Sequence, residues 1–445
     1  MHATATFPAW TLAPFVSYLL AIALVPLFFP VFWEHNRNKL LLAVVASVPV
    51  LVFLFTSPVG GHLLLHTFRE YVGFMALLSA LFVISGGICL RGTLAGTPLV
   101  NTGFLAVGIL LASFIGTTGA SVLLIRPLIR ANRARRNIRH LVIFFIFTVS
   151  NGGGLLTPLG DPPLFLGFLR GVPFEWTLRL FPVWAIFNGI LLVVFNLVDQ
   201  YVFNKEERER SGAQLEDVQE VKESLRIEGR VNLIWLAAVP AVIGVMGSFG
   251  SAWFGESGLQ GEVQTLVLIA LAGLSLLTTK KHVHLANHFS WAPILEVAVV
   301  FLGVFVTMIP ALGYLEAHGA ALGIREPWQF FWATGGLSSF LDNAPTYLTF
   351  TSLAVGVVNQ ATGANLLSTE LGALAAHPAG APLLVAISCG AVLMGAMTYI
   401  GNGPNFMVKA IAEQARVRMP GFFGYMVWSV SFLVPILLLI TLLMF

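Results

Sequence analysis

The sequence has 445 residues, of which 57% are hydrophobic and 10% are charged. Soluble domains average about 45–50% apolar and about 25% charged residues, so this composition excludes a soluble globular enzyme, a disordered chain and a nucleic-acid-binding protein. The net charge of +3 comes from 24 basic and 21 acidic residues and therefore indicates no basic binding face. Cys89 and Cys389 lie in apolar segments and have neither the spacing of a disulfide framework nor that of a metal site.

Apolar segments predict ten membrane-spanning helices and hence an all-α polytopic membrane protein. Each segment is long enough to cross a hydrocarbon core of about 30 Å, and a helix satisfies its own backbone groups there. The first segment lacks a preceding basic region and a clear cleavage site, so we expect a retained span and not a signal peptide. The predicted spans are 11–33, 40–57, 71–90, 140–168, 178–200, 231–249, 262–279, 292–315, 382–410 and 421–445.

Two further apolar segments, 98–131 and 328–358, are interrupted near their middles, at 116–119 and at 341–345. Each half of such a segment is too short to cross the membrane alone, so we expect two re-entrant helical hairpins. Each half of the chain then has five spans and one hairpin, and because five is odd the second half is inverted relative to the first. The predicted domains are a first inverted repeat at 1–204, a cytoplasmic linker at 205–230 and a second inverted repeat at 231–445.

The distribution of basic residues predicts which connections face the cytoplasm. With the N-terminus and the C-terminus both outside, 20 of the 24 Lys and Arg residues fall in the connections 34–39, 91–97, 126–139, 201–230, 280–291 and 409–420. Such a bias is the usual signature of cytoplasmic loops. We therefore expect a multi-pass protein of a bacterial inner membrane, since the loops are short and no targeting signal is present.

An internal repeat points to the functional site. A constant offset of 241 residues relates Gly154, Thr157, Gly160 and Pro163 to Gly395, Thr398, Gly401 and Pro404, and it also pairs Asp161 with Asn402. A helix interrupted by Gly and Pro leaves backbone groups unpaired at membrane depth, and these persist only where they line a cavity or bind something. One broken helix in each inverted repeat is typical of the central site of a secondary transporter.

Two acids, Asp161 and Asp342, lie at these interruptions with no basic residue nearby in the sequence. Carboxylates inside the membrane are costly, and their oxygens suit protons or a small hard cation, so we expect Na⁺ to bind at Asp161 and Asp342. Either acid could instead only cap a half-helix. Glu296 is a candidate proton relay or an interface residue. The other expected ion- or substrate-binding residues are Thr117, Thr118, Ser150, Asn151, Thr157, Asn343, Thr398, Asn402 and Asn405.

The segments 150–163, 341–346 and 398–405 resemble signatures of the ion transporter superfamily. The segments 81–90 and 291–305 are similar to its branch of NhaD-type sodium/proton antiporters and putative citrate transporters. The resemblance covers most of the chain. It implies an inverted-repeat fold with two re-entrant hairpins and two unwound helices, a homodimer, and a transport domain that moves like an elevator.

The acid at a hairpin tip, Asp342, suits a cation better than citrate, so we expect exchange of Na⁺ or Li⁺ for H⁺. The alternatives are Na⁺- or H⁺-coupled transport of citrate or a related carboxylate, and an arsenite or oxyanion permease. A membrane-embedded aspartyl protease that uses Asp161 and Asp342 is a further alternative. The sequence has no Walker motif, dinucleotide loop or nucleophile elbow. We therefore expect no enzyme activity and no cofactor beyond the coupling ions Na⁺ and H⁺, with lipid and a small ion as partners and no nucleic acid.

Overall fold

The computed structural model describes residues 7–91, 96–210, 226–254, 259–287 and 289–445. The chain is an all-α polytopic membrane protein, as the sequence predicts. Nine helical segments of the described residues are long and apolar enough to cross a membrane. One of them is Pro98–Ile115, the first half of the first predicted hairpin, so our expectation that this half is too short to cross the membrane alone does not hold by length and composition. Val231–Gly247 is a shorter apolar segment.

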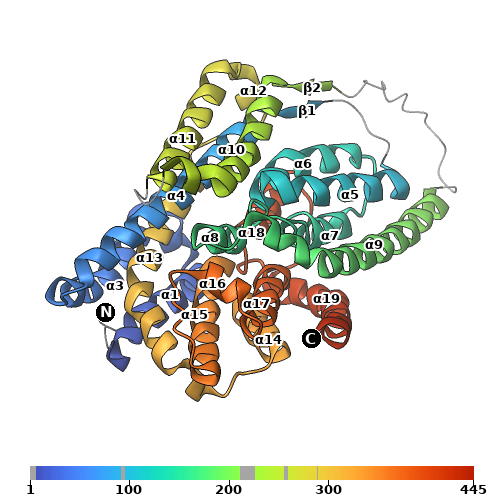
Figure 1. Cartoon of the computed structure of the whole chain (residues 1–445). Helices are drawn as coiled ribbons and strands as arrows, with labels where there is room; N and C mark the ends of the chain where they lie inside the picture. The colour runs from blue at the N-terminus through green and yellow to red at the C-terminus, as the bar shows by residue number, and fades with distance from the viewer. Residues whose placement is uncertain (1–6, 92–95, 211–225, 255–258, 288) are drawn as a thin grey trace.

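The helices pack into two groups that lie side by side (Figure 1). The first group contains α1 (Leu12–Phe28), α2 (Pro30–Trp33), α3 (Asn36–Thr56), α4 (Gly60–Gly86), α10 (Val231–Phe254), α11 (Gln260–Thr278), α12 (Lys281–Ala286) and α13 (Ala292–His318). The second group contains α5 (Pro98–Ile115), α6 (Thr117–Ala131), α7 (Arg139–Thr148), α8 (Pro162–Leu169), α9 (Phe181–Arg210), α14 (Pro327–Ser338), α15 (Asn343–Thr362), α16 (Leu371–Ala376), α17 (Gly380–Met394), α18 (Gly403–Gln414) and α19 (Phe422–Met444). Short 3-10 turns occur at Ala9–Thr11, Gly152–Leu155, Phe174–Leu180, Gly319–Leu322 and Gly395–Met397.

The predicted interruptions are present. The expected span 140–168 consists of α7 and α8 with a 3-10 turn between them, and the span 382–410 is divided in the same way into α17 and α18. The two predicted hairpins are α5–α6 and α14–α15, and in each hairpin the two helices pack against one another. The first hairpin turns at Gly116. Its backbone φ of +78° is one that residues other than glycine rarely adopt.

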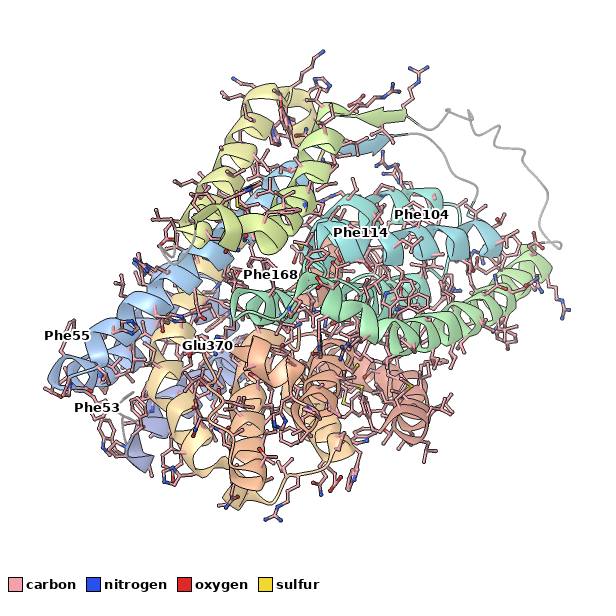
Figure 2. All side chains as sticks on the ribbon, in the orientation of Figure 1. Phe53, Phe55, Phe104, Phe114, Phe168 and Glu370 are labelled. Atoms are coloured by element: carbon pink, nitrogen blue, oxygen red, sulfur yellow. The ribbon has the colours of Figure 1, made fainter. Side chains whose placement is uncertain are left out.

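The two groups meet where α6 and α8 pack on α4 and where α15 packs on α13. At the centre of the second group, every residue of α7 from Leu141 to Thr148 is buried, as expected for a helix that is apolar on all sides. The outer faces carry exposed apolar side chains. Phe55 of α3 is 76% exposed and lies on the edge of the first group (Figure 2). Such a surface suits lipid as its surroundings.

A two-stranded antiparallel sheet, which we did not predict, connects the ends of two helices. β1 (Cys89–Arg91) follows α4, β2 (Arg226–Glu228) precedes α10, and Cys89 pairs with Glu228 (Figure 1). Asn287, which follows α12, donates hydrogen bonds to the carbonyl groups of Gly86 (2.8 Å) and Ile88 (2.6 Å). Three of the predicted cytoplasmic connections therefore lie at one end of the molecule. Their position relative to the membrane stays a prediction.

Candidate functional site

The two broken helices and the two hairpin tips meet at Asp161, which is 1% exposed. Its Oδ1 accepts hydrogen bonds from the Thr117 hydroxyl (2.8 Å) and from the Asn402 amide (3.4 Å). Its Oδ2 accepts a hydrogen bond from the Asn343 amide. The three donors come from the tip of the first hairpin, the second broken helix and the tip of the second hairpin. Four segments far apart in the sequence therefore build one buried site.

Each of these four residues is at the N-terminus of a helix. Thr117 and Asn343 are the first residues of α6 and α15, and Asp161 and Asn402 are the N-caps of α8 and α18. A helix N-terminus carries a partial positive charge of roughly half an elementary charge. The four helix ends therefore stabilise a negative charge at Asp161, although the described hydrogen bonds to its carboxylate come only from neutral groups.

A second set of contacts connects the two broken helices through asparagine side chains. The Asn402 amide donates to the Ser150 carbonyl oxygen (3.2 Å) and to Asn151 Oδ1 (3.1 Å). The Asn151 amide in turn donates to Asn405 Oδ1 (2.7 Å). The Asn405 amide donates to the carbonyl oxygens of Gly395 (2.8 Å) and Thr398 (2.9 Å). These side chains satisfy the backbone groups that the interruptions leave free and fix the position of Asn402 beside Asp161.

Thr157 and Thr398 have the same role in the two repeats. The Thr157 hydroxyl donates to the Ser113 carbonyl oxygen of the first hairpin, and the Thr398 hydroxyl donates to the Ser339 carbonyl oxygen of the second (2.5 Å). Each hydroxyl also accepts a hydrogen bond of 3.2 Å from the backbone N–H two residues later. These threonines fasten each broken helix to its own hairpin, and neither is hydrogen-bonded to Asp161 among the described contacts.

Ser113 and Ser339 are residues of the site that the sequence analysis missed. The Ser113 hydroxyl donates to the Gly153 carbonyl oxygen (2.7 Å), and the Ser339 hydroxyl donates to the Met394 carbonyl oxygen (3.2 Å). Ser113 lies three residues before Gly116 at the break of the first hairpin, and Ser339 lies three residues before Asp342 at the break of the second. This common spacing is a signal in the sequence that could have identified them.

Asp342 differs from Asp161 in its surroundings. It is half-buried, and its Oδ1 accepts a hydrogen bond from the Ala344 backbone N–H (3.1 Å), so it caps α15. The described hydrogen bonds do not join it to Asp161. Its neighbour Asn343 does contact Asp161, and the Asn343 Oδ1 atom is buried without a hydrogen-bond partner among the described residues. That oxygen is free to bind a cation or a water molecule.

Three predicted site residues make no described hydrogen bond to the Asp161 carboxylate. The Ser150 hydroxyl shares a hydrogen bond of 2.8 Å with Ser121, and Thr118 is a half-buried residue of the adjacent cavity. The structure does not bring Glu296 into this group of side chains. The Glu296 carboxylate, 45% exposed, forms an ion pair of 2.6 Å with Lys39 of α3.

A cavity of about 60 Å³ adjoins Asp161. It lies between the second half of α4, the tip of the first hairpin, the start of α8 and the start of α13, and its lining includes Leu77, Leu81, Thr118, Pro293 and Val297. The volume is enough for a few water molecules. A dehydrated or partly hydrated small ion therefore fits this space.

A separate buried cluster lies at the base of the first hairpin. Asp199 of α9 is fully buried, and its carboxylate contacts Arg135 (2.5 Å), His140 (2.8 Å) and the amide of Asn101 (2.8 Å). These partners come from α5, from α7 and from the connection between α6 and α7. The cluster therefore fixes the first hairpin relative to α7, which leads directly to Ser150.

One known protein family matches nearly the whole chain. A family described as "Putative citrate transport" matches residues 4–445. None of the curated proteins matches the chain. The match supports the expected relationship to ion transporters in general, whereas the NhaD-type branch stays a prediction. The chain belongs to this putative citrate transport family and is a multi-pass membrane transporter.

Proposed function

We propose that the protein exchanges Na⁺ or Li⁺ for H⁺, and that Asp161 binds the two ions alternately. The observation that carries the proposal is a buried carboxylate whose described hydrogen bonds all come from neutral groups, beside a cavity of about 60 Å³. Carboxylate, amide and hydroxyl oxygens are the ligands that small hard cations prefer.

The burial of Asp161 explains why exchange would be obligatory. A buried ionised group without a counter-charge costs several kcal/mol, even after relaxation of its surroundings. The site therefore changes its accessibility most readily when Asp161 carries either a proton or a metal cation. Because one carboxylate cannot hold both at full strength, the arrival of one ion favours the release of the other.

Asp342 is the second acid of the proposed site. Its carboxylate lies one residue from Asn343, whose amide contacts Asp161. We propose that Asp342 adds negative charge and a further oxygen ligand near the cation. Thr117, Asn343 and Asn402 would supply neutral oxygens. The side chains of Thr157, Thr398 and Asn405 hydrogen-bond backbone carbonyl groups of the hairpins and the second broken helix and so keep these segments in place.

Coupled transport of citrate or a related carboxylate is the second candidate function. The family match favours it, and four helix N-termini converge on the site, where they would also attract an anion. The carboxylate of Asp161 already occupies this point, where it would repel an anion. This observation makes cation exchange the better-supported function. The contacts also disfavour an aspartyl protease, because Asp161 and Asp342 share no described hydrogen bond.

The surroundings of the protein are part of the proposal. We place it in a bacterial inner membrane as a homodimer, with both termini outside, as the basic-residue bias and the family resemblance imply. Three predicted cytoplasmic connections meet near β1 and β2. In this orientation the cavity, which is lined by the start of α13, lies towards the cytoplasmic half.

Everted vesicles from a bacterial strain that lacks its own antiporters would test the proposed function. Respiration acidifies the vesicles and quenches a pH-sensitive dye, and Na⁺, Li⁺, K⁺ or citrate is then added over a range of pH. We expect Na⁺ or Li⁺ to restore the fluorescence and K⁺ and citrate to leave it quenched. Absence of a response to every cation, together with uptake of radiolabelled citrate, would contradict cation exchange and support the second candidate.

A further inference from the structure

A buried ion pair connects the two helix groups at a distance from Asp161. Arg170, the C-cap of α8, donates from Nε to Glu70 Oε1 (2.8 Å) and from Nη2 to Glu70 Oε2 (3.0 Å). Arg170 is 5% exposed and Glu70 is 7% exposed. Glu70 belongs to α4 of the first group, and α8 belongs to the second. Two parallel hydrogen bonds between a guanidinium and a carboxylate fix both distance and orientation.

The ion pair and the cavity lie at opposite ends of the contact between α4 and α8. Glu70 precedes the cavity residue Leu77 by seven positions in α4, which is roughly 10 Å along a helix. The other helix of the contact, α8, begins beside Asp161 at the cavity and ends at Arg170. The groove between α4 and α8 is therefore hollow at one end and closed by the ion pair at the other.

A second acid of the first group strengthens this closure. The Arg170 Nη1 atom donates to the Ser368 carbonyl oxygen (3.1 Å), and the Ser368 N–H donates to the Glu316 carboxylate of α13 (3.2 Å). The Arg170 carbonyl oxygen accepts from the Gly372 N–H (3.2 Å). Glu370, labelled in Figure 2, marks this segment of the chain before α16. Two carboxylates of the first group thus hold the end of α8 and the segment that covers it.

We propose that Glu70 and Arg170 form a latch, which closes the route to Asp161 at the end opposite the cavity and opens once in each transport cycle. The latch rests on the proposed transport function but not on the identity of the ion. A well-packed apolar pair would be at least as stable as a buried ion pair, so stability alone does not explain these charges. An ion pair with fixed geometry can separate and then form again with the same two hydrogen bonds.

Two cysteine reporters would test the latch in a background where Cys89 and Cys389 are replaced by alanine. Val297→Cys lies in the cavity, and Gly73→Cys lies on α4 between Glu70 and Leu77, where a Cβ atom would have only ordinary contacts at 3.6 Å and 3.8 Å. A membrane-impermeant maleimide is applied from each side of the membrane, without any transport substrate. In the otherwise unchanged protein we expect Val297→Cys to react with maleimide applied from the side of the membrane nearer the cavity, which is the cytoplasmic side in the proposed orientation. We expect Gly73→Cys to be unreactive from either side.

Opening the latch should reverse this pattern. With Glu70→Gln and Arg170→Gln together, we expect the labelling rate at Val297→Cys to fall at least threefold and Gly73→Cys to react from the opposite side. The exchanged pair Glu70→Arg with Arg170→Glu should restore the original pattern. Glu262→Gln is the matched control, because its ion pair with Arg69 (3.2 Å) joins α11 to α4 within the first group.

Unchanged labelling at both reporters in a folded double variant would overturn the latch. If the double variant does not fold, Arg170→Lys keeps the charge but loses the two-pronged contact, and it should shift the labelling in the same direction by a smaller factor. No shift with Arg170→Lys would also overturn the proposal. Because no substrate is present, failure of the vesicle assay for Na⁺/H⁺ exchange would leave this result unaffected.

Discussion

Asp161→Asn tests the proposed function most directly, because it removes the charge at the centre of the site and keeps the shape of the side chain. A cation about 3 Å from a carboxylate is stabilised by about 5 kcal/mol at an effective dielectric constant of about 20. The asparagine would also present an NH₂ group to a site that offers donors from Thr117, Asn343 and Asn402. An unsatisfied buried polar group costs about 1–3 kcal/mol more.

The electrostatic contribution alone corresponds to between three and four powers of ten in the dissociation constant, at about 1.4 kcal/mol for each tenfold change. In everted vesicles, Na⁺ at any practical concentration should therefore fail to restore the fluorescence of the pH-sensitive dye. The variant should still migrate as a folded protein in size-exclusion chromatography. Glu262→Gln, an acid-to-amide change at a partly exposed position of α11, is the control and should retain exchange.

A half-saturating Na⁺ concentration within about tenfold of that of the unchanged protein would refute the reasoning, because the charge would then contribute less than about 1.4 kcal/mol to binding. Asp342→Asn gives an internal comparison. Asparagine is as good an N-cap as aspartate, so α15 should keep its first turn. We expect a smaller loss of Na⁺ affinity than for Asp161→Asn, because the described hydrogen bonds do not join the two acids.

Three further predictions concern the frame around the site. Gly160→Ala would place a Cβ atom 2.2 Å from a backbone oxygen, so we expect loss of transport or of folded protein, whereas Gly189→Ala, with no atom within 4 Å, should retain both. Asp199→Asn removes the nearest carboxylate from the buried charge of Arg135 and leaves the Glu206 carboxylate at 3.8 Å, so a stability loss of up to about 3–5 kcal/mol should appear in thermal unfolding. Thr398→Val removes the hydrogen-bond donor to the Ser339 carbonyl oxygen and the acceptor for the N–H groups of Ile400 and Gly401, which should cost about 1–3 kcal/mol, while Thr398→Ser should restore most of it. Equal unfolding temperatures for the valine and serine variants would contradict that role.

Most of the fold could be predicted because its signals are local or repeated. Runs of apolar residues predict spans, and glycine and proline predict the interruptions that separate α7 from α8 and α17 from α18. The constant offset of 241 residues placed Thr157 and Thr398 in equivalent positions, and their hydrogen bonds to the hairpins are indeed equivalent. β1 and β2 were missed because three-residue strands are too short to show a periodic pattern.

The arrangement of the site was only partly predictable. The interruptions indicated which polar residues to consider, but the contact between Asp161 and Asn343 joins residues 182 positions apart, so it depends on how the first broken helix packs on the second hairpin. From the sequence, Asp161 and Asp342 could not be told apart, since both lie at breaks. In the structure, Asp161 is enclosed by four helix ends, whereas the Asp342 side chain caps α15. Glu296 was considered for its charge alone, and Lys39 lies too far away in the sequence to predict their pairing.

The strand pair has a consequence for how the chain is assembled. α4 leads into β1 and β2 leads into α10, so everything from residue 92 to residue 225, which includes α5 to α9, is an insertion between two neighbouring helices of the first group. The chain leaves the first group at β1 and returns to it at β2, and the two strands are paired. The place of α10 beside α4 is therefore held by this pairing and by their own contacts, independently of how the inserted helices pack.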